Sequence, residues 1–191
     1  MIQPTRDTTQ PSQLDAWLEQ EQRLGAVLDA GAGCGIARPE QVAGLSGLEV
    51  MQAMLRGELP YPPLARTLDF RVIEVAAGRA VFQGTPRFEH YNLLGNVHGG
   101  WFAAILDSAM GCAVHTMMPA GRGYTTAELG INLVRAITTK VSRVRAEGRV
   151  IHCGRQLATA EARLVGPDGT LYAHGTTTCL VFELGRAPAR N

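Results

Sequence analysis

The sequence predicts an α+β domain in which an antiparallel sheet wraps around one long central helix. Two observations lead to this prediction. The longest run of apolar and small residues lies within residues 92–118, follows His98-Gly99-Gly100, and is broken only by Asp107 and His115. On both sides of this run, apolar and polar residues alternate as they do in half-buried strands. One buried helix between strands requires a sheet that curls around it.

The central helix is predicted from its periodicity. Apolar or small residues recur at helical spacing on one face, and the opposite side is apolar as well, which is typical of a helix covered on nearly all sides. The first face consists of Trp101, Ala104, Ile105, Ser108, Ala109 and Cys112, and the second of Phe102, Leu106, Met110 and Val114. Asp107 is then a carboxylate in an apolar surround, which is costly unless it is paired. It marks either a hydrogen-bonded structural site or chemistry.

A membrane-spanning segment is the alternative for this run, because about 20 apolar residues suffice to cross a bilayer. Against it, a carboxylate near the middle of a span costs a few kcal/mol on insertion. The run is also followed by a turn-rich loop, residues 119–123, instead of a basic flank. We therefore expect a helix buried in protein and no membrane partner.

Length, charge and cysteines narrow the class of protein. The 191 residues suffice for one domain with a core and an appendage, and the net charge of +1 gives no reason to expect nucleic acid as a partner. The sequence begins without a basic-then-apolar leader, so a cytoplasmic protein is expected. The cysteines stand singly, without the spacing of a zinc site or a disulfide framework: Cys34, Cys112, Cys153 and Cys179. We expect neither a metal nor another cofactor.

A helical extension is expected over residues 1–45. Residues 1–12 are polar, contain two prolines and are interpreted as a loosely attached arm. Residues 31–35, G-A-G-C-G, are expected to end the following helix; a phosphate-binding loop is the alternative, but the glycine spacing differs and no strand precedes it. Ser12 is suited to cap this helix, and its apolar stripe, expected to pack on the domain or on a partner subunit, comprises Leu14, Trp17, Leu18, Leu24, Val27 and Leu28.

The main domain is expected at residues 46–185, followed by a frayed tail at 186–191. It opens with a short helix from Ser46 to Arg56 and a stiff connector at residues 60–63. Alternation and turn signals then predict the strands. They form a hairpin, from residue 68 to the turn at 77–78 and over 79–83, and, after the central helix, a four-stranded meander over residues 129–133, 141–152, 155–165 and 170–182.

Three motifs lie in and around the central helix. Residues 90–100 read H-Y-N-L-L-G-N-V-H-G-G, residues 106–111 read L-D-S-A-M-G, and residues 125–133 read T-T-A-E-L-G-I-N-L. Together they resemble the signature of hotdog-fold acyl-CoA thioesterases, and within them the phenylacetate-pathway (PaaI-type) branch, over residues 60–183. The proline usual after the third strand is absent, since residues 134–137 read V-R-A-I; this concerns the exit of the strand rather than the chemistry.

The resemblance implies the hotdog fold, hydrolysis of an acyl-CoA thioester and a set of site residues. Functional positions fall on Asn92, His98, Gly99, Asp107 and Thr126. Gly100 and, by a looser match, the turn Gly154-Arg155 are implied as contacts of coenzyme A.

These residues also suit thioester hydrolysis on chemical grounds. A helix N-terminus presents free N–H groups, and Gly99 and Gly100 let a carbonyl approach them closely, so an oxyanion would be stabilised there. Asp107 would act as general base on a water or as the nucleophile itself. The Thr126 hydroxyl would hold the water or the carboxylate, and Asn92 would donate to the thioester or to the water. Glu128 is the runner-up carboxylate, because strand parity places it on the same side as Thr126.

Each of these residues also has a structural interpretation. Asn92 and His98 would cap the helix and satisfy loop carbonyls, and Gly99 would allow close packing. Thr126 would be an ordinary strand residue, and Asp107 would pair with a backbone N–H. The alternative function is a sensor or regulatory subunit that binds acyl-CoA without turnover; a hotdog dehydratase or hydratase is a weaker one, since its acid and histidine spacing is not evident. The residue types do not identify the acyl group.

A homodimer with shared active sites is expected, because one chain cannot complete the site. Gly99 and Asp107 are eight residues apart, about 12 Å along a helix axis. Both must lie within about 3–4 Å of the reacting centre. Two antiparallel helices side by side would bring Gly99 of one subunit to Asp107 of the other. The resemblance implies the same arrangement, with a tetramer as a further option.

Overall fold

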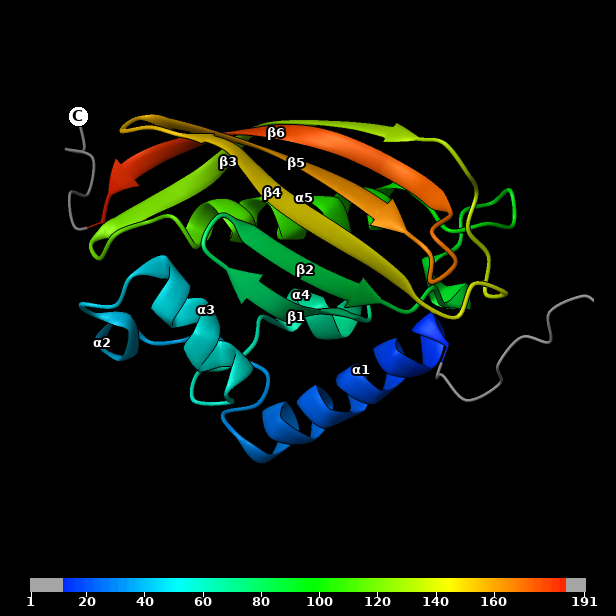
Figure 1. Cartoon of the computed structure of the whole chain (residues 1–191), viewed down its shortest axis with the longest axis horizontal. Helices are drawn as coiled ribbons and strands as arrows, with labels where there is room; N and C mark the ends of the chain where they lie inside the picture. The colour runs from blue at the N-terminus through cyan, green and yellow to red at the C-terminus, as the bar shows by residue number, and fades with distance from the viewer. Residues whose placement is uncertain (1–11, 185–191) are drawn as a thin grey trace, which may run out of the picture.

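The structure is a computed structural model that describes residues 12–184. Six antiparallel strands form one sheet in the order β1-β2-β4-β5-β6-β3, which curls around the central helix α5 (Figure 1). The predicted α+β architecture is confirmed, whereas the expected arm up to residue 11 and the tail at 186–191 lie outside the described residues. The elements are α1 (Gln13–Ala30), α2 (Pro39–Val42), α3 (Gly47–Leu55), α4 (Pro63–Thr67), β1 (Phe70–Ala76), β2 (Arg79–Gly84), a 3-10 helix η1 (Phe88–His90), α5 (Gly99–His115), β3 (Arg122–Leu133), β4 (Val144–Cys153), β5 (Leu157–Val165) and β6 (Leu171–Glu183).

The connectivity of the last four strands differs from the predicted meander. β4, β5 and β6 are consecutive neighbours, but β3 pairs with β6 and forms an edge of the sheet. Alternation along a strand shows which residues face the core and does not identify the neighbouring strand. The connection over residues 134–143 is longer than a hairpin turn and takes the chain to β2, where β4 pairs. β3 also begins at Arg122, within the segment expected to be a loop.

α5 is buried on the side that faces the sheet. The opposite side, where Ala104, Asp107 and Ser108 lie, is only half-buried. The expectation of a helix covered on nearly all sides is therefore wrong for the single chain, because one sheet reaches only one side of a helix. Asp107 is half-buried rather than enclosed. The large sheet-facing side chains are fully buried: Phe102, Ile105, Leu106, Met110 and Val114.

The two longer N-terminal helices begin where the sequence predicts them, and both have a serine cap. The Ser12 hydroxyl accepts a hydrogen bond from the Asp15 N–H (3.2 Å), and the Asp15 carboxylate accepts one from the Ser12 N–H (3.1 Å); Ser46 caps α3 in the same way. Gly31 ends α1 beside Gly57, whose carbonyl oxygen would lie 2.3 Å from a Cβ at position 31. The helix terminator is confirmed.

Two short helices, α2 and α4, were not expected from the sequence. Each begins at a proline, Pro39 and Pro63, whose fixed φ suits the first turn of a helix. The expected stiff connector at residues 60–63 therefore runs directly into α4.

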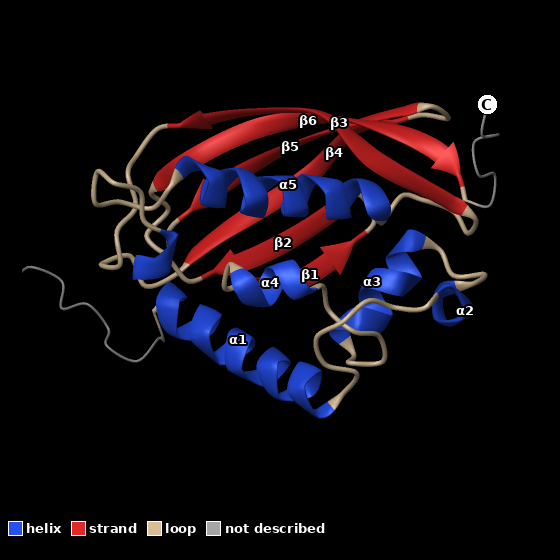
Figure 2. Cartoon of the chain, turned by 180° about the vertical axis from the view of Figure 1, so that it is seen from behind, coloured by secondary structure: helices blue, strands red, loops and turns tan. Residues whose placement is uncertain are grey.

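The extension packs on its own domain, with α1 lying below α4 and β1 in Figure 2. Only part of the predicted stripe is buried in this contact. Trp17 and Leu28 are buried, whereas Leu18 and Val27 are 37% and 44% exposed. The Trp17 ring lies beneath the Arg145 guanidinium, whose carbon is 4.4 Å from the ring centroid. These contacts hold α1 beside the β1 side of the sheet. No helix within residues 12–184 has the length and apolar character to cross a membrane.

Candidate active site

The loop before α5 is held by Asn92. The Asn92 side-chain oxygen accepts from the Leu94 N–H (2.9 Å) and the Asn96 N–H (3.4 Å), and its amide nitrogen donates to the Asn96 side-chain oxygen (3.1 Å). Gly95 takes a positive φ of 80° at the turn of this loop. Asn92 therefore shapes the backbone that leads into α5, and its amide nitrogen has a second hydrogen to offer a ligand.

His98 and Gly99 lie at the N-terminus of α5 and differ in their hydrogen bonding. His98 Nδ1 accepts a hydrogen bond from the Gly100 N–H (2.8 Å) and so caps the helix. Within residues 12–184, the Gly99 N–H donates no hydrogen bond. The Gly99 N–H is thus the donor at this helix end that is left for a ligand, while the donor of Gly100 is already used.

The predicted pair of Asp107 and Thr126 forms. The Thr126 hydroxyl donates to the Asp107 carboxylate at 2.9 Å, across the gap between α5 and β3. In the described part of the chain, the second carboxylate oxygen has no hydrogen-bond partner. Burial, and secondly the charge of Asp107, raise the pKa of Cys112 to about 12, so this thiol stays protonated. The Thr126 hydroxyl therefore orients the Asp107 carboxylate on this part of the helix.

Glu128 lies on the other face of β3, so the expectation from strand parity is wrong. Thr126 pairs with the buried Cys179, but Glu128 pairs with Thr178, whose side chain faces the opposite way. A β-bulge between Thr126 and Glu128, at Ala127, inserts one residue and reverses the alternation. Glu128 is exposed on the convex face of the sheet, on the side away from Asp107.

The turn Gly154-Arg155 lies at the end of β4, away from α5. The Gly154 N–H donates to the Leu157 carbonyl (2.8 Å), and the Arg155 carbonyl accepts from the Arg122 guanidinium at the start of β3. This turn lines an open cavity of about 580 Å³ together with His152. Arg155 is exposed there, so its charge is available to an anionic ligand.

His90 packs against the loop that precedes α5, and it was not selected as a site residue from the sequence. Its ring stacks on Trp101 at 5.6 Å, its Nδ1 accepts from the Arg87 N–H (3.2 Å), and its carbonyl accepts from the His98 N–H (2.8 Å). Burial lowers the pKa of His90, which favours the neutral ring. The only feature of the sequence that could have indicated this role is the position of His90 at the start of the H-Y-N motif.

Within one chain the predicted residues form two groups. Asn92, His98 and Gly99 lie at the N-terminus of α5, and Asp107 and Thr126 lie eight residues further along, about 12 Å at 1.5 Å per residue. α5 is continuous over this stretch, so the groups do not converge on one atom. Among residues 12–184, no cluster of His, Cys, Asp and Glu is arranged to hold a metal ion.

Comparison with known proteins places the chain in a family. The family model of the thioesterase superfamily matches residues 94–173. The solved structure of the TT0310 protein from Thermus thermophilus is 30% identical, and the match covers 62% of this chain and 96% of that one with a TM-score of 0.56. The chain belongs to the thioesterase superfamily. The hotdog fold and the likeness to the PaaI-type branch are confirmed.

Two further structures relate this superfamily member to the PaaI-type branch. A putative thioesterase of Ralstonia eutropha JMP134, described as phenylacetic acid degradation-related, is 29% identical over 68% of this chain and 97% of its own, with a TM-score of 0.62. A variant of the phenylacetic acid degradation protein PaaI from Thermus thermophilus is 29% identical over 62% and 97%, with a TM-score of 0.56. No curated protein matches the chain. Because the two structures cover 68% and 62% of this chain, about a third of it has no counterpart in them.

Proposed function

We propose that the protein is an acyl-CoA thioesterase, hydrolysing an acyl- or aryl-acyl-CoA to the free acid and coenzyme A. Membership of the thioesterase superfamily supports the reaction class. The observation that supports this assignment most directly is the Thr126–Asp107 hydrogen bond of 2.9 Å, which orients a carboxylate with one oxygen left for a water. No cofactor is needed for this chemistry.

The reaction follows from the two groups of residues. The thioester carbonyl accepts a hydrogen bond from the Gly99 N–H, at the positive end of α5. Asp107 takes a proton from a water, whose oxygen attacks the carbonyl carbon. The tetrahedral oxyanion collapses, the C–S bond breaks, and the thiolate of coenzyme A takes the proton back from Asp107. If Asp107 instead attacks the carbon itself, the thiolate leaves and a mixed anhydride forms. Hydrolysis of this anhydride at the Asp107 carbonyl carbon in ¹⁸O-labelled water would put the label into Asp107 in a single turnover.

A shared site in a homodimer supplies both groups to one substrate. β3 is an edge strand of 12 residues, and side chains along it are exposed at Thr126, Ala127 and Glu128. An exposed edge of this length is a ready template for pairing with another chain. Two β3 strands paired antiparallel about a two-fold axis would set the α5 helices side by side and oppose Gly99 of one subunit to Asp107 of the other.

Coenzyme A would lie along the rim of this dimer. Gly100, at the N-terminal end of α5, and Arg155, on the β4–β5 turn, are the proposed contacts, because a pantetheine chain needs close approach and a phosphate needs a cation. The loop residue Asn92 would hold the thioester or the water with its remaining amide hydrogen.

The experiment that tests this function is thiol release from a panel of aryl-, short- and long-chain acyl-CoAs. Turnover of at least one member of the panel is expected. Saturable binding of these thioesters without thiol release would instead identify the alternative, an acyl-CoA-binding sensor or regulatory subunit.

A further inference from the structure

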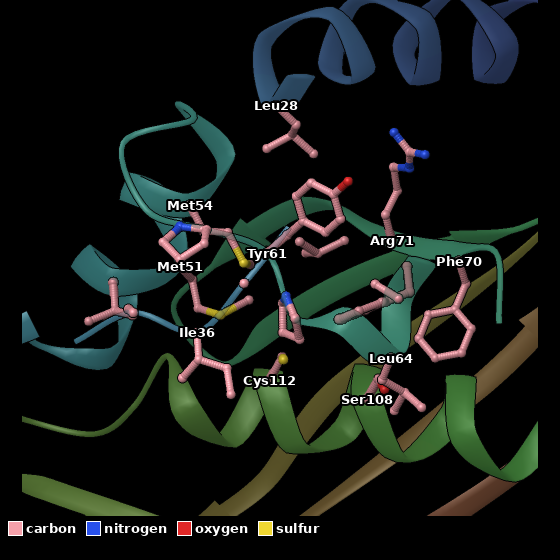
Figure 3. Close-up of a pocket in the computed structure, with 18 residues that line it drawn as sticks. Leu28, Ile36, Met51, Met54, Tyr61, Leu64, Phe70, Arg71, Ser108 and Cys112 are labelled. Carbon is pink, nitrogen blue, oxygen red and sulfur yellow. The ribbon is translucent and has the colours of Figure 1, made fainter. Parts of the chain in front are cut away.

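A second feature of α5 is a cavity on its other flank, between the N-terminal extension and β1 (Figure 3). The cavity has a volume of about 420 Å³, which is within the range of small-molecule sites. α1 contributes Leu28, α3 contributes Met51 and Met54, and α5 contributes Ser108 and Cys112. Most of the wall is therefore built by segments that precede the residues matched by the family model.

The interior of this cavity is apolar. The Ser108 hydroxyl already donates to the Ala104 carbonyl (2.7 Å), and the Cys112 thiol is uncharged. Among the described residues, Arg71 is the one charged side chain at the cavity, and it extends away from it toward α1 (Figure 3), where its Nη1 would lie 3.3 Å from a Cβ at Gly25. Apart from Arg71 and the Tyr61 hydroxyl, the remaining side chains of the lining are apolar or already paired, so the cavity suits an alkyl or aryl group.

The mouth of the cavity is apolar as well. Ile36 and Leu64 lie at the cavity and are 84% and 51% exposed. Large apolar side chains left in water at the rim of a hollow are typical of a surface that binds an apolar ligand.

The cavity begins one residue from the proposed catalytic carboxylate. Ser108 directly follows Asp107 in α5, and Ala104 neighbours both of them, at i+3 and i+4. The single methyl group of Ala104 leaves this part of the helix surface open. An acyl chain whose carbonyl carbon lies at Asp107 would cross Ala104 and enter the cavity beside Ser108.

We propose that this cavity receives the apolar end of the acyl group, so that the enzyme prefers thioesters of medium-length alkyl or arylalkyl acids over acetyl-CoA. This inference rests on the proposed function. Each methylene that enters the cavity raises kcat/KM about fourfold, as expected from the transfer of a methylene out of water. The increase stops at the chain length that fills the space.

The test compares three variants with the wild type on saturated acyl-CoAs from acetyl to palmitoyl. Ala65→Phe fills the cavity from α4 and should shorten the limiting chain length; Val50→Ala enlarges it from α3 and should lengthen it. Ala26→Phe makes the same change as the first on the exposed side of α1 and should leave the profile unchanged. Melting temperatures check that each variant is folded.

Binding of S-decyl-CoA, a thioether that cannot be hydrolysed, is measured in parallel by calorimetry. Binding to Ala65→Phe that is at least tenfold weaker than binding to Ala26→Phe supports the cavity proposal. If this difference is found but no acyl-CoA is turned over, the cavity proposal stands and only the proposed catalytic function has failed. Turnover with the same chain-length profile in all four proteins would overturn the cavity proposal while the thioesterase stands. Absence of both turnover and S-decyl-CoA binding would overturn both.

Discussion

One edge of the sheet is covered by helices of the same chain, and the other edge is exposed. At the β1 edge the chain supplies its own cover: α1, α3 and α4 pack there, and Arg143 forms an ion pair with Glu21 at 2.7 Å. At the β3 edge the side chains are exposed, and the two groups of site residues lie apart along α5. The covered edge can thus be tested through stability, whereas the open edge, where we propose a second subunit, must be tested through activity.

The largest effect is expected from Asp107→Asn. The amide cannot take a proton from water, although it can still accept the Thr126 hydrogen bond, so the fold should persist. Turnover should decrease about 10²–10⁴-fold, the range for loss of a positioned acid–base group. Steady-state thiol release and the melting temperature are measured together. Asp29→Asn, on the exposed surface of α1, is the matched control; activity of Asp107→Asn within threefold of wild type would place the chemistry elsewhere.

Subunit mixing tests whether the open edge is completed by a second copy. Asp107→Ala and Asn92→Ala, each nearly inactive, are denatured and refolded together. In a mixed dimer with shared sites, one site carries both substitutions and the other carries neither, so random pairing should recover about a quarter of wild-type activity. If heterodimers form and activity does not return, each site is built within one chain.

Stability measurements test the covered edge. Trp17 is 6% exposed and packs beneath Arg145, so Trp17→Ala should cost about 3–5 kcal/mol, as for other buried aromatic side chains. In a protein of this size that lowers the melting temperature by about 6–20 °C. Leu18→Ala, one residue along and 37% exposed, should have a much smaller effect. Deletion of residues 1–45 should lower the melting temperature further or cause aggregation; unchanged melting would show that the extension is dispensable.

A pH series tests whether His90 and His115 are held in the neutral form in the folded protein. Burial lowers the pKa of both His90 and His115 below the usual 6.5. As the pH falls below 6.5, the unfolded chain binds protons that the folded protein does not, so the free energy of unfolding decreases toward acid. The melting temperature should therefore fall between pH 7 and pH 5. His90→Gln should make this decrease shallower, and His174→Gln, at an exposed position, should not; equal slopes in all three proteins would contradict the assignment.

The smallest effect is expected from Glu128→Gln. This side chain lies on the convex face, beyond the bulge at Ala127, so activity should stay within about twofold of wild type, as for surface positions away from a site. A loss comparable to that of Asp107→Asn would show that Glu128 reaches a site in the assembled protein.

Local signals in the sequence predicted the local structure. Ser12 and Ser46 identified two helix starts, and the motif residues Asp107 and Thr126, distant in sequence, are joined by a hydrogen bond as expected. The neighbour of β3 was missed because alternation does not encode pairing. The bulge at Ala127 was missed because no Gly or Pro marks it. The cavity could not be predicted either, since its walls come from elements far apart in the chain.

The bulge at Ala127 shifts the alternation of side chains along β3 by one residue. As a result, both halves of the strand direct the residues that α5 and the core require toward the helix. Upstream, Tyr124 and Thr126 face α5; downstream, Leu129 and Ile131 do, and both pack against the core. With unbroken alternation, Glu128 and its successors at 130 and 132 would point at the helix, and the apolar residues would point into water. Ala127 is the extra residue that the bulge accommodates, so deleting it should leave Thr126, Leu129 and Ile131 on the core face of a strand with regular alternation.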